Sequence, residues 1–226
     1  MENHNENSRP EPDLEFFKKK VEEMEKKYGI TDCIYDFCIR EFSKIRLSEL
    51  NEEHEIRIIR PFLLTWGNMT RVLGYDGVKA ICGKLRDISE EIEPLRKKDF
   101  TKVNLNEIKD QIIELFDKLR ETKFISKKGK LREAGSTTAS KILHLVCPDL
   151  FIMWDSAIRT RYGKNNGDGK DYFEFLTEMQ RRIWKKLRSE IEELQQKYGK
   201  KVTRIIDQYN WAITHKNSLK RLTIIQ

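Results

Sequence analysis

The sequence predicts an all-α protein, and two observations lead to that class. Apolar residues recur every three or four positions along nearly every stretch, which is the spacing of one helix face. Neither a convincing two-residue alternation, as in a strand, nor an internal repeat is visible. Short helices of this kind bury their apolar stripes against one another, so we expect one multi-helix domain at residues 13–226 behind a flexible tail at residues 1–12.

Each expected helix is bounded by a turn or capping residue. In chain order the helices are expected at about residues 12–28, 31–42, 48–66, 78–92, 104–119, 136–147, 155–162, 170–198 and 202–215. Gly29 stops the first helix, and Pro61 predicts a kink or restart inside the third. Gly74 and Gly77 break the chain before the fourth, and the glycine-rich residues 163–169 predict a flexible connection.

Length and composition are those of a globular chain without a membrane segment. The 226 residues suffice for one good core, and no apolar run approaches the roughly 18 residues of a membrane span. The polar amino terminus lacks the apolar core of a secretory signal, so we expect a cytoplasmic protein, nucleoid-associated if prokaryotic. The four cysteines are scattered without a CxxC pair and the four histidines are also scattered, so we expect free thiols, no metal and no cofactor.

Positive charge is concentrated in one part of the chain. The net charge is +7, and residues 123–170 contain ten Lys or Arg against four Asp or Glu, which accounts for +6 of it. A basic segment of this kind is typical of a protein that binds a phosphate backbone. The alternative is a solvated, lysine-rich loop with no such partner.

One motif within this basic segment carries most of the functional signal. At Gly135-Ser-Thr-Thr-Ala-Ser a glycine opens an apolar helix, and after the break at Pro148 a short hydrophobic run leads to Asp155. Gly135 can adopt a positive φ, which leaves the next backbone N–H groups available at a helix N-terminus. Such a terminus binds phosphate without base selectivity.

This pattern resembles the helix-hairpin-helix DNA glycosylase superfamily, and it is closest to the 8-oxoguanine branch. The resemblance covers about residues 129–162, where a glycine hairpin, a helix, the run Leu150-Phe-Ile-Met-Trp and then Asp155 follow in the family's order. It implies a helix-hairpin-helix fold in which Asp155 is the catalytic carboxylate. It also implies a DNA substrate whose target base is flipped out of the duplex.

The motif departs from the family at one position. The lysine nucleophile of the family stands two residues after the hairpin glycine, where this chain has Thr137. Lys141 follows one turn later on the same helix face. Either Lys141 is the Schiff-base nucleophile, or the enzyme is monofunctional and Asp155 supports attack by water.

The chemistry of base excision explains these residue types. Breaking an N-glycosidic bond develops positive charge on the sugar, which a nearby carboxylate stabilises. A lysine attacks only as the neutral amine, so burial or cationic neighbours must lower its pKa, and we expect the dense positive charge around Lys141 to act in that direction. The candidate DNA-binding residues are Lys130, Arg132, Gly135, Ser136, Thr137, Arg159 and Arg161. The candidate base-pocket residues are Trp66, His144, Trp154, Gln208 and Trp211.

Three functional hypotheses follow from these observations. The first is a monomeric DNA glycosylase, with or without AP-lyase activity, for which an 8-oxopurine is the leading substrate. The second is a non-catalytic helix-hairpin-helix DNA-binding module in a repair or defence complex, favoured by the absence of lysine at position 137. The third is a helical protein-interaction factor with little affinity for DNA even at low salt.

Overall fold

The computed structural model describes residues 13–28, 32–65 and 69–215. These residues are mostly helical, so the predicted helical class is confirmed. The expected flexible tail and Trp66 lie outside the described residues.

The amino-terminal half is a series of mostly short helices. Its elements are α1 (Leu14–Tyr28), α2 (Asp32–Phe42), η1 (Leu47–Glu49), α3 (Glu52–His54), η2 (Glu55–Ile59), α4 (Arg60–Thr65), α5 (Met69–Asp87), α6 (Ser89–Ile92), η3 (Glu93–Lys97), η4 (Leu105–Ile108) and α7 (Lys109–Arg120). The helix runs through Pro61 without restarting: the π-helical turn η2 ends at Ile59, and Arg60, with φ −65° and ψ −47°, begins α4 directly.

The two glycines expected to break the chain behave differently. Gly74 has φ 64° and ψ −166° and interrupts α5, as predicted. Gly77 lies inside the helix, so the break predicted there is wrong. A Cβ at Gly77 would lie 3.2 Å from the ring of Phe124, so the glycine allows a later segment to pack closely against α5.

The carboxy-terminal half contains a feature that the sequence pattern did not reveal. Its elements are β1 (Lys123–Ile125), β2 (Leu131–Glu133), α8 (Ser136–Val146), α9 (Ser156–Arg161), α10 (Gly169–Glu178), η5 (Met179–Trp184), α11 (Arg188–Tyr198) and α12 (Val202–Thr214). The strands pair antiparallel, with Ile125 opposite Leu131, so the expectation of no strand is wrong. Strands of three residues are too short for an alternation to be recognised. A β-hairpin therefore joins α7 to α8.

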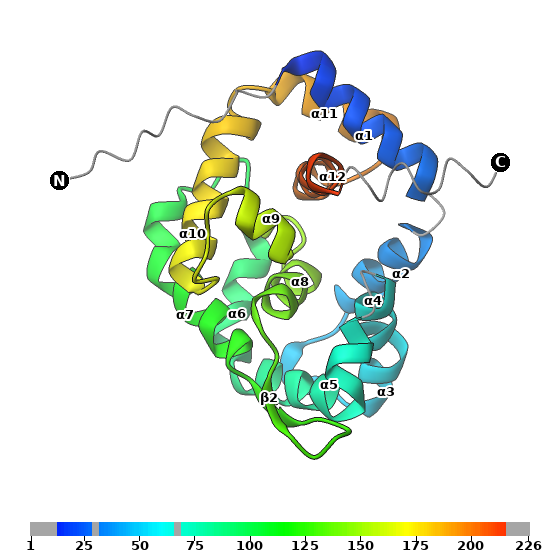
Figure 1. Cartoon of the computed structure of the whole chain (residues 1–226), viewed down its shortest axis with the longest axis vertical. Helices are drawn as coiled ribbons and strands as arrows, with labels where there is room; N and C mark the ends of the chain where they lie inside the picture. The colour runs from blue at the N-terminus through cyan, green and yellow to red at the C-terminus, as the bar shows by residue number, and fades with distance from the viewer. Residues whose placement is uncertain (1–12, 29–31, 66–68, 216–226) are drawn as a thin grey trace.

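The central helix of the fold is α12. Figure 1 shows it end-on in red, with α1 and α11 on one side and α8 and α9 on the other, and it contacts α1, α9 and α11. Nearly all of its side chains are buried, including the polar Arg204, Asp207, Gln208 and Asn210. Helix α8 is equally enclosed and packs against α7, α2 and α4. The apolar helix of the motif is therefore a core element.

The connection between α9 and α10 is held by specific hydrogen bonds. Ser136 at the start of α8 donates its hydroxyl to the Gly167 carbonyl oxygen. The Gly169 N–H donates to Asp117 Oδ1 at 2.9 Å. The single charged helix expected at residues 170–198 is divided into α10, η5 and α11.

Candidate functional site

The start of α8 has the geometry expected from its glycine. Gly135 is the N-cap, with φ 79° and ψ 165°, a conformation that glycine adopts without strain. Its N–H donates to the Arg120 carbonyl oxygen at 2.9 Å, which ties the turn to the end of α7. Its lack of a side chain leaves the first N–H groups of α8 without a side-chain cap.

Lys141 lies in the second turn of α8 and is buried, with 8% of its surface exposed. Burial lowers the pKa of Lys141 to about 8, although the negative charges of Asp207 and Asp155 act in the opposite direction. Of the two expected causes, burial is therefore the one that lowers this pKa, and neighbouring cations are not among its causes. The same result brings Lys141 and Asp155 into one electrostatic environment.

Asp155 is the N-cap of α9, and its two oxygens have different partners. Oδ1 accepts a hydrogen bond from the Ile158 N–H at 2.9 Å. Oδ2 lies 3.1 Å from Nε2 of His215, and 26% of the Asp155 side chain is exposed. The carboxylate is therefore neither sealed in the interior nor displayed on an outer face. His215 in turn stacks on Trp211, with ring centroids 4.7 Å apart.

A hydroxyl group fixes the segment that carries Asp155 against α8. Ser140 Oγ donates to the Trp154 carbonyl oxygen at 3.0 Å, and the Trp154 N–H lies 3.2 Å from the same Oγ. Tyr172 adds a further anchor by donating its hydroxyl to the Ile152 carbonyl oxygen at 2.8 Å. These bonds hold Asp155 in a set position relative to Lys141, which follows Ser140 in the chain.

Two residues that sequence reasoning missed complete this cluster. Asp207, on α12, is buried, and burial raises its pKa to about 6 even though Arg204 opposes the shift. His215 follows the same helix and pairs with Asp155. The available signal was helical spacing, because positions 207, 211 and 215 recur every four residues and share one face of a helix. We call Lys141, Asp155, Asp207 and His215 the α8–α9 site.

Three predicted base-pocket residues lie in the core. His144 is fully buried, with Nδ1 2.6 Å from the Phe151 carbonyl oxygen and Nε2 2.7 Å from the Tyr35 hydroxyl, and burial lowers its pKa to about 3. Trp154 packs among aromatic rings and donates Nε1–H to the Ser136 carbonyl oxygen at 3.3 Å. A flipped base would reach these rings only if the core opened.

Gln208 is also buried in the core, whereas Trp211 is not. The Gln208 amide donates to Glu25, and only 1% of the Gln208 side chain is exposed. Trp211 is half-buried and stacks on His215 beside the α8–α9 site. Of the four described base-pocket candidates, Trp211 is thus the one placed at the cluster.

The predicted DNA-binding residues are distributed around the start of α8. Lys130 and Arg132 are exposed on the hairpin, Gly135, Ser136 and Thr137 are half-buried at the helix start, and Arg161 is exposed on α9. Arg159 is half-buried, and its guanidinium lies 6.0 Å from the centroid of the Trp154 ring. These positions come from one stretch of the chain, which runs from the hairpin through α8 to α9.

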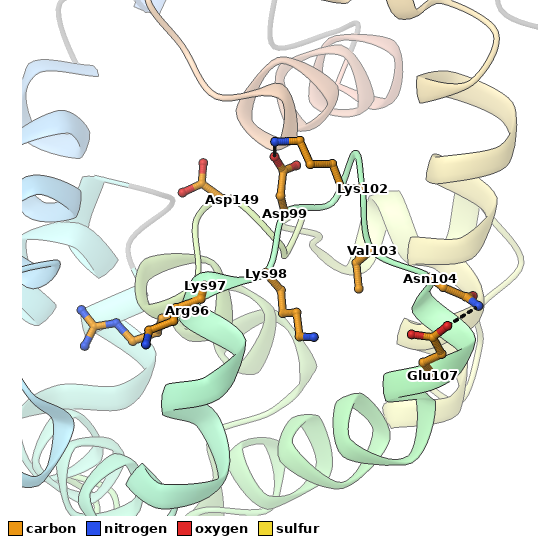
Figure 2. A pocket seen from close by; sticks show the side chains of 9 residues that line it. All are labelled: Arg96, Lys97, Lys98, Asp99, Lys102, Val103, Asn104, Glu107 and Asp149. Atoms are coloured by element: carbon orange, nitrogen blue, oxygen red, sulfur yellow. Dashed lines mark hydrogen bonds and ion pairs between the residues drawn. The ribbon is translucent and has the colours of Figure 1, made fainter.

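Three cavities lined by described residues lie elsewhere, around Asp149. The largest measures about 560 Å³, and Figure 2 shows it with Asp99 paired to Lys102 and Asn104 to Glu107. The others measure about 470 and 290 Å³, and neither Lys141 nor Asp155 lines any of the three. Within the described ranges, no cluster of three or more metal-binding side chains occurs, and no helix is both long and apolar enough to cross a membrane.

Comparison with known proteins assigns no relative to the chain. No family model, no curated protein and no solved structure matches it. The functional argument therefore depends on the α8–α9 site and its surroundings.

Proposed function

We propose that this protein is a DNA glycosylase, with AP-lyase activity, that excises a damaged or modified base, an 8-oxopurine being the leading candidate. The observation that carries this proposal is the buried amine of Lys141, on whose pKa the charge of the Asp155 carboxylate acts. The basic hairpin leads directly into the uncapped start of α8, and together they offer a surface for the DNA backbone.

The lowered pKa gives Lys141 the protonation state that a nucleophile needs. With a pKa of about 8, about one amine in ten is neutral at pH 7, compared with roughly one in three thousand at the ordinary pKa of 10.5. The Nζ lone pair forms a bond to the sugar C1′ while the bond from C1′ to the base breaks and the base takes up a proton. Loss of the amine proton and opening of the sugar ring then give a Schiff base.

Asp155 supplies negative charge where positive charge develops. As the base departs, the sugar acquires oxocarbenium character, which a fixed carboxylate stabilises. The bond from Ile158 N–H and the contact with His215 hold the carboxylate in place before the reaction. If Lys141 does not attack, the same carboxylate orients a water molecule, and the enzyme is monofunctional.

A second candidate function is a non-catalytic DNA-binding module. Two observations favour it: Thr137 stands where the resembling family has its lysine, and Asp155 caps a helix, a purely structural task. This module would bind DNA through the same basic surface and release no base.

The decisive test incubates the protein with duplexes that each carry one lesion, with and without borohydride. We expect base release from an 8-oxopurine duplex and a covalent, borohydride-trapped adduct that is absent in Lys141→Ala. Asp155→Asn should lower base release about 100- to 1,000-fold, because the charge at the transition state is lost. Release without trapping identifies the monofunctional enzyme, and binding without release across a broad lesion panel leaves only the module.

The chain offers matched controls for both variants. Asp168 caps α10 in the way that Asp155 caps α9, with its side chain accepting from the Asp171 N–H at 2.9 Å. Asp168→Asn therefore removes the negative charge from the same type of cap, whose side-chain oxygen still accepts the N–H, and it should retain base release. Lys164, half-buried in the same basic segment, is the control for Lys141, and Lys164→Ala should still be trapped. Equal losses in Asp155→Asn and Asp168→Asn would contradict the proposed role of Asp155.

A further inference from the structure

The β-hairpin before α8 displays two aliphatic side chains to solvent. Ile125 is 51% exposed and Leu131 63% exposed, the latter being the most exposed of the large hydrophobic residues in the described part of the chain. They are partners across the two strands, so their side chains lie side by side on one face. On the other face Phe124 is buried against α5, which anchors the hairpin to the protein.

The hairpin is closed by hydrogen bonds at both of its ends. At its tip, Ser126 N–H donates to the Lys130 carbonyl oxygen at 2.9 Å, and Gly129 N–H donates to the Ser126 carbonyl oxygen at 2.8 Å. At its base, Ala134 N–H donates to the Thr122 carbonyl oxygen at 3.0 Å. Figure 1 shows the hairpin projecting at the bottom of the molecule, beyond α5. The aliphatic pair is thus presented on a fixed support.

Cations surround this aliphatic pair. Residues 123–133 contain five Lys or Arg and one acidic residue, Glu133. Lys127, Lys128, Lys130 and Arg132 are all exposed. An apolar tip within a dense positive field complements a polyanion that also has an apolar interior, and a stacked nucleic-acid duplex has both properties.

We propose that the hairpin is a duplex-inserting element, in which Ile125 and Leu131 enter a base step while the surrounding cations hold the phosphates. This inference rests on the proposed function, for which it supplies a means of unstacking the target base. Leu131 precedes Gly135 by four residues, so at most roughly 13 Å of extended chain separates the inserted pair from the start of α8.

An anionic membrane is the other surface that basic and aliphatic side chains can bind. Two aliphatic residues are too few for lasting membrane attachment, which needs a larger apolar area. One or two apolar side chains are enough to unstack and kink a base step. The hairpin is also joined directly to the start of α8, where the proposed DNA contacts lie. These observations favour the duplex.

The test measures 2-aminopurine fluorescence in a short duplex that carries an 8-oxopurine beside the reporter base. Insertion should raise the fluorescence of the duplex on addition of the protein, because the reporter becomes unstacked. The double variant Ile125→Ser, Leu131→Ser should lose most of this rise and bind with a Kd about tenfold higher. Ile34 and Ile56, which are 46% and 47% exposed on other elements, provide the matched double control, whose signal should not change.

The outcomes separate this inference from the proposed function. Unstacking that persists in the hairpin variant overturns the inference, and base release by the same samples would leave the glycosylase proposal standing. Unstacking that depends on the hairpin, with no base released by any protein, supports the inference and overturns the catalytic proposal. Binding to anionic vesicles but not to the duplex, with the same dependence on Ile125 and Leu131, overturns both.

Discussion

The protein buries a lysine in each of two regions, and the surroundings of these lysines differ. Lys200, 9% exposed, donates hydrogen bonds to the carboxylates of Glu25 and Asp32. Arg204 donates to Asp32 at 2.9 Å and also to Asp207. We call Glu25, Asp32, Lys200 and Arg204 the α12 ion cluster. In the α8–α9 site, by contrast, burial of Lys141 outweighs the effect of two nearby carboxylates on its pKa.

The difference separates a structural lysine from a reactive one. Hydrogen-bonded carboxylates offset the desolvation of the α12 ion cluster, which links α1, α2 and α12. At Lys141 desolvation dominates and favours the neutral amine, which is the reactive form. Asp207 connects the two regions, because it pairs with Arg204 and also raises the pKa of Lys141.

The largest expected effect concerns the stability of the α12 ion cluster. Arg204→Met removes a cation of which 1% is exposed and leaves Asp32 and Asp207 without it in the interior. Breaking a buried ion pair from one side costs about 3–5 kcal/mol. Urea unfolding followed by circular dichroism measures this loss in the free energy of unfolding.

Arg161 is the control for that measurement, since it is exposed on α9. Arg161→Met should change the free energy of unfolding by no more than about 0.5 kcal/mol. If both arginine variants lost the same stability, the α12 ion cluster would not be the structural element described here.

The next effect compares the two buried lysines directly. Lys200→Met removes a donor from both Glu25 and Asp32, and it should cost about 2–4 kcal/mol of unfolding free energy. Lys141→Met replaces a desolvated amine by an apolar side chain of similar length, so its stability should stay within about 1 kcal/mol of wild type. The same urea titrations measure both variants. If Lys141→Met lost more unfolding free energy than Lys200→Met, Lys141 rather than Lys200 would be the structural lysine.

Sequence reasoning found those parts of the site that depend on local signals. Gly135 and Asp155 were assigned to helix starts because glycine and aspartate are favoured there, and both positions are confirmed as N-caps. The hairpin was missed because strands of three residues leave no recognisable period. Asp207 and His215 were missed because their meeting with Lys141 and Asp155 depends on the packing of α12 against α9.

The base-pocket residues show a different limit of prediction from sequence. An aromatic or histidine side chain on an apolar helix face has the same sequence pattern whether it lines a cavity or fills the core. His144 and Trp154 therefore could not be placed from their spacing, and the structure puts both in the core. Which of the two expected causes lowers the Lys141 pKa could not be decided from the sequence for a similar reason, because burial is not visible in a count of charges.

A pH titration sharpens the contrast at Lys141. The neutral fraction of an amine rises with pH up to its pKa, so trapping by borohydride should increase about tenfold per pH unit below pH 8 and level off above it. In Asp207→Asn a negative charge that raises the pKa of Lys141 is lost. The pH at which trapping levels off should therefore fall by roughly half a unit to one unit. Single-turnover trapping across the pH range gives both profiles. If trapping by the wild type levelled off only near pH 10.5, Lys141 would have the pKa of an ordinary lysine.

The smallest expected effect tests the partner of the candidate catalytic carboxylate. His215 and Asp155 are 23% and 26% exposed, so their pair lies in partly solvated surroundings and adds little stability. His215→Gln should change the free energy of unfolding by less than about 0.5 kcal/mol. Base release should fall by only about two- to fivefold, because Ile158 N–H still holds the other oxygen of Asp155.

His54 is the control, because it is a histidine that also contacts a polar partner, the Asn51 N–H at 3.3 Å, far from the site in the chain. His54→Gln should leave base release unchanged. A loss in His215→Gln as large as that in Asp155→Asn would make the imidazole part of the chemistry rather than a positioning group. An unchanged rate would mean that the cap at Ile158 alone orients the carboxylate, and the α8–α9 site would then reduce to Lys141, Asp155 and Asp207.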